Sequence, residues 1–212
     1  MKNTQQHILH KTPNGLLEVC VEKPDSPENV EGIGIVCHPH PLHGGTMNNK
    51  VVTTVAKAFR EQNLISVRFN YRGVGLSEGK FDHTIGETID TLNIIEWVSQ
   101  EFTAQKIMLA GFSFGAYVSL KAATTTNVTL SHVISIAPAV NHADFSQLIP
   151  ACPWTVFIAE NDNIVPAENI LQWIDTLNKK PKVVFFPDSS HFFDGQLIKL
   201  KNTIKSTLID QT

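Results

Sequence analysis

Short runs rich in Val, Ile and Phe alternate along this chain with longer stretches whose apolar residues recur every three or four positions. The apolar runs predict strands at 32–37, 64–69, 106–110, 132–137, 155–159 and 182–186. The stretches between them predict helices that begin near Thr46, Thr84, Ser113, Pro166 and Leu197. Strands that are apolar throughout suit a sheet covered on both faces, and helices between strands imply parallel pairing. The pattern therefore predicts a doubly wound, mostly parallel α/β sheet.

The first part of the chain and the helix starts add detail to this prediction. LLEVCVEK (16–23) alternates polar and apolar residues, which predicts one or two antiparallel edge strands. Thr84 and Glu87 have the spacing of a capping box, and Gly44–Gly45 is expected to lead into a helix capped by Thr46. With no internal repeat or low-complexity linker, we expect a single domain over residues 1–212.

Composition narrows the class of protein. The 212 residues are 42% hydrophobic and 17% charged, which suits a sizeable core. The net charge is -3 and the basic residues form no stripe, so nucleic-acid binding is not expected. The apolar runs are too short to span a membrane, and the polar start lacks a signal-peptide core. Three cysteines are an odd number and lie far apart, so a disulfide framework is not expected. We expect a cytoplasmic globular protein whose oligomeric state the sequence does not determine.

Polar residues gather after the predicted strands, where ligands bind in open parallel sheets. HPHPLHGG follows 32–37, GFSFG follows 106–110, ENDNIVP follows 155–159, and PDSSHFF follows 182–186. A serine, an acid and a histidine thus stand at three strand ends of one sheet edge. This convergence predicts a site that none of the three residues predicts alone.

GFSFG (111–115) is the sharpest local signal. A G-x-S-x-G turn between strand and helix holds a serine in a strained conformation with its hydroxyl exposed, and the flanking glycines let strand and helix approach each other. We therefore interpret Ser113 as a nucleophile.

A serine nucleophile needs a base and a group that orients the base. His191 follows the last predicted strand and suits the role of base, since histidine titrates near neutral pH. Asp162 competes with Glu160, Asp188 and Asp194 for the role of the acid. Asp162 is favoured because it lies in a loop just past the strand at 155–159, whereas Asp188 is three residues from His191 on the same loop. The chain order serine, acid, histidine is the one this architecture uses.

From about residue 15 to its end, the sequence resembles the small bacterial α/β-hydrolases without a lid. The resemblance implies a catalytic triad of Ser113, Asp162 and His191, and a structural turn, not a phosphate loop, in RGVGLS (72–77). Two departures are Ala159, where many members have glycine, and a proline in place of glycine in the His-Gly turn. The segments that carry the resemblance are the His-Pro turn at 38–39, FNYRGVGLSEG (69–79), GFSFG, AENDNIVP (159–166) and SSHFF (189–193).

HPHPLHGG (38–45) admits two interpretations. His38, His40 and His43 copy the histidine spacing of a metallo-β-lactamase-type site, but Leu42 stands where that motif carries an aspartate. The favoured alternative is a turn that supplies a backbone N–H to an oxyanion hole, in which Phe114 supplies the other. Pro39 and Pro41 have no N–H, so His40 is the expected donor and Leu42 the reserve, while His38 and His43 are expected to form hydrogen bonds or pocket walls.

These residues together predict a serine hydrolase of small esters or thioesters that needs no cofactor. The residues between the strands at 132–137 and 155–159 are too few for a lid domain, so we expect an open site. Tyr71, Phe112 and Phe192 are expected to line an apolar pocket together with Phe114. A metal-dependent hydrolase and a non-catalytic binding homologue remain alternatives. A peptidase is less favoured, because no residues remain for a peptide-selecting domain.

Overall fold

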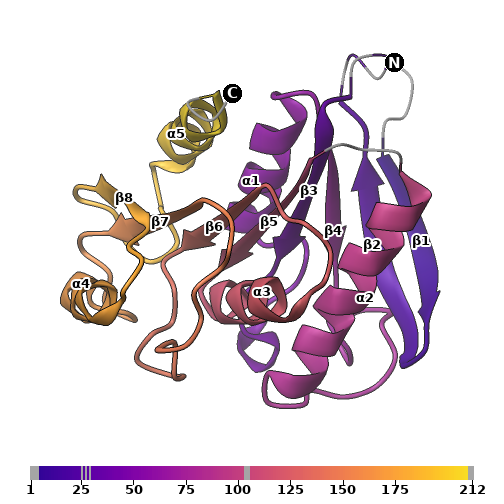
Figure 1. Cartoon of the computed structure of the whole chain (residues 1–212), viewed down its shortest axis with the longest axis horizontal. Helices are drawn as coiled ribbons and strands as arrows, with labels where there is room; N and C mark the ends of the chain where they lie inside the picture. The colour runs from indigo at the N-terminus through magenta and orange to yellow at the C-terminus, as the bar shows by residue number, and fades with distance from the viewer. Residues whose placement is uncertain (1–4, 25, 27, 29, 103–105, 210–212) are drawn as a thin grey trace.

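The computed structural model describes residues 5–24, 26, 28, 30–102 and 106–209. Within these ranges one eight-stranded sheet runs through the molecule (Figure 1). Its strands are β1 (Gln5–Thr12), β2 (Gly15–Glu22), β3 (Gly32–Cys37), β4 (Leu64–Phe69), β5 (Ile107–Phe112), β6 (His132–Ile136), β7 (Trp154–Ala159) and β8 (Lys182–Phe186).

The strand order is β1-β2-β4-β3-β5-β6-β7-β8. β1 pairs antiparallel with β2 and β2 pairs antiparallel with β4, whereas all pairs from β4 to β8 are parallel. The predicted mostly parallel sheet with antiparallel strands at one edge is confirmed. Because β3 to β8 run in one direction, the loops that follow them meet at one edge of the sheet.

Helices cover both faces of the sheet (Figure 1). α1 and α5 share one apolar cluster with one face, and α2, α3 and α4 share the other cluster with the opposite face. The strands β3 to β7 are buried along their whole length, which is why their sequences are apolar throughout. The helices are α1 (Lys50–Arg60), α2 (Ile85–Glu101), α3 (Phe114–Thr125), α4 (Ala167–Thr176) and α5 (Leu197–Ile209).

Two local expectations were wrong. α1 begins at Lys50 and not near Thr46, because a short 3-10 helix (Pro41–His43) and a turn come first. Its cap is Asn49, whose side chain accepts the N–H of Val51 at 2.9 Å. The strand β8 is not covered on both faces: it ends the sheet, and Val183 and Phe185 are 37% and 43% exposed.

The start of α2 follows its prediction. The Glu87 carboxylate accepts the N–H of Thr84 at 2.8 Å, as a capping box requires. Among the residues that the structure describes, no helix has the length and apolar character needed to cross a membrane.

Candidate active site

Ser113 lies at the turn between β5 and α3, in a backbone conformation that side chains rarely adopt. Its φ is 55° and its ψ is -116°, and its N–H donates to the carbonyl of Ile136 in the neighbouring strand at 2.9 Å. Such strain persists only where the surrounding structure enforces it. The turn presents the Ser113 hydroxyl at the carboxyl edge of the sheet.

The two glycines of GFSFG have a steric cause. A Cβ on Gly111 would lie 2.1 Å from the carbonyl oxygen of Gly115, and a Cβ on Gly115 would lie 2.4 Å from that of Cys37. Any side chain at either position would force β5 and α3, or α3 and β3, apart. The motif is therefore a packing requirement of the turn that carries Ser113.

Ser113, His191 and Asp162 form a continuous hydrogen-bonded chain. The Ser113 Oγ lies 3.1 Å from Nε2 of His191, and Nδ1 of the same ring lies 2.6 Å from Oδ2 of Asp162. Oδ1 of Asp162 accepts the N–H groups of Ile164 and Val165 at 2.9 and 2.8 Å. His191 and Asp162 are buried, so water does not compete for these bonds. The structure thus brings together the three residues that the sequence singled out.

Two of the competing acids, Glu160 and Asp194, have other partners, and the third, Asp188, is exposed. Glu160 accepts the backbone N–H of Asp188 at 3.1 Å. Asp194 forms an ion pair with Lys50 and accepts the hydroxyl of Ser190 at 3.2 Å. Asp162 is the acid whose carboxylate reaches His191.

His38 is a buried structural histidine. Its Nδ1 donates to the carbonyl of Pro39 at 2.7 Å, and its Nε2 accepts the N–H of Tyr71 at 3.1 Å. Burial lowers the pKa of this ring to about 3, so the ring is neutral at physiological pH. With both nitrogens engaged, His38 cannot join His40 and His43 around a metal ion. The described ranges contain no group of three His, Cys, Asp or Glu side chains placed to hold one.

The two candidate oxyanion donors differ in availability. The N–H of Leu42 donates to Nδ1 of His40 at 3.2 Å within the 3-10 turn. The N–H of His40 has no acceptor among the residues described, and Phe114 begins α3, so its N–H has no acceptor within that helix. Of the two N–H groups, His40 is the one left for a ligand.

Three comparisons bear on this geometry. The sequence model of the X-Pro dipeptidyl-peptidase (S15) family, a family of α/β-hydrolases, matches residues 16–151, well over half of the chain. A solved α/β serine hydrolase homologue from Coxiella burnetii is 42% identical, with 98% of each chain covered and a TM-score of 0.90. The chain belongs to the α/β serine hydrolases. A member without a lid from Xanthomonas campestris is 40% identical over 97% of this hydrolase and 94% of that chain, with a TM-score of 0.91.

The hydrolase also has a relative among curated sequences. An uncharacterized protein of Rickettsia prowazekii is 34% identical, over 95% of this chain and 88% of the relative. The predicted family and fold, a minimal α/β-hydrolase without a lid, are confirmed by these matches. None of them identifies the substrate.

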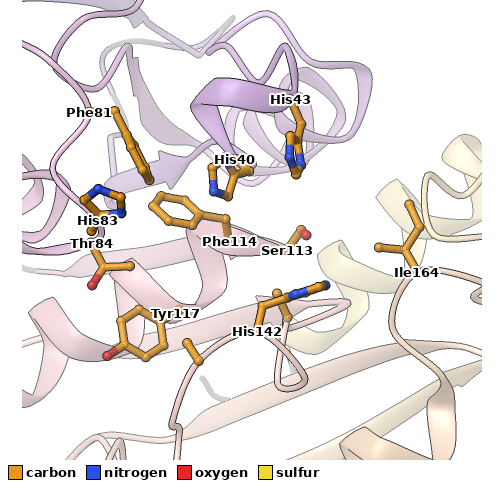
Figure 2. Close-up of a pocket in the computed structure, with 12 residues that line it drawn as sticks. His40, His43, Phe81, His83, Thr84, Ser113, Phe114, Tyr117, His142 and Ile164 are labelled. Carbon is orange, nitrogen blue, oxygen red and sulfur yellow. The ribbon is translucent and has the colours of Figure 1, made fainter.

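A pocket of about 370 Å³ opens in front of Ser113 (Figure 2). Segments that follow five different strands contribute to the pocket, so no local sequence pattern predicts its lining residues. Its lining is His40, His43, Phe81, His83, Thr84, Ser113, Phe114, Tyr117, Ala139, His142, Ala143 and Ile164. The sequence analysis anticipated His43 and Phe114 as pocket residues and missed the others beyond Ser113 and His40.

The expected aromatic lining of the hydrolase pocket needs correction. Tyr71 and Phe112 have no exposed surface and do not line the pocket, because their rings fill the space behind it. Phe192 does not line it either, since its ring packs edge-on against His191 with centroids 5.1 Å apart. Phe114 is the aromatic residue of that prediction that does line the pocket.

One wall of the pocket is held in a strained conformation. His83 and Thr84 both have positive φ, 48° and 78°. The buried carboxylate of Glu87 accepts the N–H groups of Asp82 and Thr84, both at 2.8 Å, and so clamps the turn. The loop from β4 is thereby fixed against α2, with its side chains directed at the pocket.

Proposed function

We propose that the hydrolase cleaves a small ester or thioester through an acyl-enzyme on Ser113. The observation that carries the proposal is the hydrogen-bonded chain from the Ser113 hydroxyl through His191 to Asp162. A serine hydroxyl becomes nucleophilic only when a base within hydrogen-bond reach takes its proton, and His191 is within that reach.

In this mechanism each of the three groups has one task. Asp162 fixes the His191 tautomer with the proton on Nδ1, which leaves Nε2 free to accept the proton of Ser113 as Oγ attacks the carbonyl carbon. The protonated imidazole then donates this proton to the leaving alcohol or thiol. Water, deprotonated by the same histidine, attacks the acyl carbon and releases the acid and free Ser113.

The oxyanion that forms in both steps needs fixed donors. The backbone N–H groups of Phe114 and His40 are proposed to supply them, with Leu42 in reserve, and such donors are worth roughly 10²–10³ in rate. The rigid Pro39–Pro41 turn supports this role, since it holds the His40 N–H without any other acceptor among the residues described.

A peptidase activity is the second candidate, favoured by the match to the X-Pro dipeptidyl-peptidase model. A dipeptide-releasing enzyme must accommodate the cationic α-amino group of its substrate, which calls for a carboxylate or several carbonyl acceptors. The pocket lining contains four histidines and no aspartate or glutamate. This lining supports an ester or thioester over a peptide with a free amino terminus.

The cytoplasm is proposed as the location. Cys20, Cys37 and Cys152 are all free thiols, as is usual for proteins of a reducing compartment.

A fluorophosphonate probe tests the nucleophile. We expect the wild-type chain to be labelled, Ser113→Ala to escape labelling, and Ser146→Ala, which removes an exposed serine away from the pocket, to be labelled like the wild type. Turnover of 4-nitrophenyl acetate, acetyl-CoA and Ala-Pro-4-nitroanilide then ranks ester, thioester and peptide. Labelling of Ser113→Ala at the wild-type rate would refute the proposal.

A further inference from the structure

Four of the nine histidines of the chain surround the pocket in front of Ser113. His40 and His43 come from the loop after β3, His83 from the loop after β4, and His142 from the connection between β6 and β7. Figure 2 shows His40 and His43 on one side of Ser113 and His142 on the opposite side. The proposed acyl transfer uses only the backbone of one of them, so their side chains have no role in that chemistry.

These imidazoles are available to a ligand. The rings of His43, His83 and His142 form no hydrogen bond with any other residue that the structure describes, and that of His40 uses only Nδ1. His40 and His43 stack with ring centroids 4.5 Å apart. Burial lowers the pKa of His40, and the neighbouring His43, His142 and His83 lower it further because positive charges on these rings would repel each other. A bound anion would offset this repulsion around His40.

The acids near these four histidines face other partners. On the His83 loop, Glu87 accepts two backbone N–H groups, and Asp82 lies 3.9 Å from the Arg72 guanidinium. On the His142 loop, the exposed Asp144 accepts the N–H of Ser146 at 2.9 Å. No acid thus contributes to the pocket lining.

The remaining titratable groups near the pocket are Asp162, His191 and Tyr117. Asp162 is hydrogen-bonded to His191, which in turn is hydrogen-bonded to Ser113. Tyr117 lines the pocket and carries the ammonium of Lys121 over its ring at 5.6 Å. The lining itself therefore offers imidazole and hydroxyl donors, and a substrate anion would meet no fixed negative charge there.

We propose that the histidine-lined pocket binds an anionic group, a carboxylate or phosphate, carried by the substrate that Ser113 cleaves. The proposal rests on the function proposed above and names its substrate class. An anion among the four rings accepts hydrogen bonds from protonated imidazoles and offsets their mutual repulsion, so binding takes up protons. Beside these rings, Phe81 and Phe114 form an aromatic surface with centroids 6.0 Å apart, which suits a short apolar or aromatic spacer between the anion and the scissile bond.

Matched esters test this inference. One pair is mono-4-nitrophenyl glutarate and its methyl ester, with the charge on the acyl side. The other is 4-acetoxybenzoate and its methyl ester, with the charge on the leaving group. The ratio of kcat/KM, charged over neutral, cancels the titration of the catalytic base within each pair. We expect this ratio to rise about tenfold from pH 8 to pH 6 in at least one pair, as expected for hydrogen bonds to a charged group.

Variants assign the effect to the pocket. In a double variant of His83→Asn, which suits a positive φ, and His142→Gln, we expect the rise of the ratio from pH 8 to pH 6 to be clearly smaller than in the wild type, because only His40 and His43 remain. The matched control is His7→Gln on β1, at the far edge of the sheet, which is expected to keep the wild-type ratio. Ratios near one at every pH in both pairs, with both esters turned over, would overturn this inference and leave the proposed function intact.

A binding experiment keeps the test independent of turnover. In Ser113→Ala, histidine NMR titrations with glutarate and with its neutral diamide are compared. We expect glutarate, and not the diamide, to raise the titration midpoints of the pocket histidines. If neither ester reacts and the fluorophosphonate does not label Ser113, the proposed function fails; equal midpoints with both ligands refute the anion site.

Discussion

The histidines behind Ser113 and those around the pocket in front of it differ in burial and in hydrogen bonding. On the protein side, His38 and His191 are buried, and both nitrogens of each ring are hydrogen-bonded. On the pocket side, His43, His83 and His142 are exposed, and their rings have no hydrogen-bond partner among the residues described. Histidine thus occurs in two different environments only a few residues apart in sequence, buried at His38 and exposed at His43.

The difference shows how burial and hydrogen bonding determine the role of an imidazole. A ring with two fixed partners has a fixed tautomer and orientation, which serves structure and directed proton transfer. A ring without partners can change its protonation state when a ligand arrives. On this account the protein side of Ser113 determines the reaction, and the pocket side selects the substrate.

The largest effect is expected where the fixed tautomer is lost. In Asp162→Asn the side-chain amide can present an N–H to Nδ1 of His191, which favours the wrong tautomer, and kcat is expected to fall roughly 10⁴-fold. Steady-state kinetics with a neutral ester measure it. The matched control is Asp188→Asn, at a position whose φ of 57° asparagine accepts, and it is expected to stay within about twofold of the wild type. An equal loss in both variants would contradict the assignment of Asp162.

A second test separates the backbone of His40 from its ring. His40 has a φ of -54°, which proline can adopt, so His40→Pro removes the N–H with little change in backbone conformation. His40→Ala removes the ring and keeps the N–H. With a neutral ester, kcat of His40→Pro is expected to be roughly 10²–10³ lower than that of His40→Ala. Equal kcat values would remove His40 from the oxyanion hole.

A third test uses the depressed pKa of the buried His38. The folded ring has a pKa of about 3 and the unfolded ring about 6.5, so between these values only the unfolded chain gains a proton. His38 therefore lowers stability by about 1.4 kcal/mol for each pH unit below 6.5, and it contributes no pH dependence above that value.

Urea unfolding of the wild type and His38→Gln measures this slope. Glutamine can still accept the Tyr71 N–H but cannot titrate, so the loss of stability from pH 6.5 to pH 5 is expected to be about 2 kcal/mol smaller in the variant. Acidic side chains titrate alike in both proteins and cancel in the difference. The same slope in both proteins would show that folded His38 takes up the proton.

The smallest effect is expected on the pocket side. His142 is exposed, and its ring has no hydrogen bond to another described residue, so His142→Gln is expected to change the free energy of unfolding by less than about 0.5 kcal/mol. Urea unfolding at pH 7 measures it beside His38→Gln. A loss of 2 kcal/mol or more would mean that His142 is structural, and the contrast between the two sides would disappear.

The sequence predicted the protein side of this contrast better than the pocket side. Ser113, Asp162 and His191 follow the parallel strands β5, β7 and β8, and parallel strands bring their ends together whatever the details of the loops. The turn between β5 and α3 that carries Ser113 was also predictable, because the glycines of GFSFG meet a steric requirement within five residues.

Features set by loop geometry were not predictable. The start of α1 at Lys50 depends on the turn over residues 46–49, which separates the helix from Gly44–Gly45. Tyr71 and Phe112 were expected in the pocket, but the direction of their side chains depends on the strands behind the site, and both are fully buried. His83 and His142 reach the pocket from separate loops, and no spacing in the sequence connects them to His40.

Direct detection of the acyl-enzyme addresses the nucleophile itself. The wild-type chain is mixed with 4-nitrophenyl acetate, quenched in acid within the first turnover, digested and mapped by mass spectrometry. The account predicts a burst of nitrophenol and an acetyl group on Ser113, which accumulates where deacylation is slow. Neither the burst nor the acetyl group is expected in Ser113→Ala. Steady turnover with the acetyl group on another side chain, and none on Ser113, would contradict it.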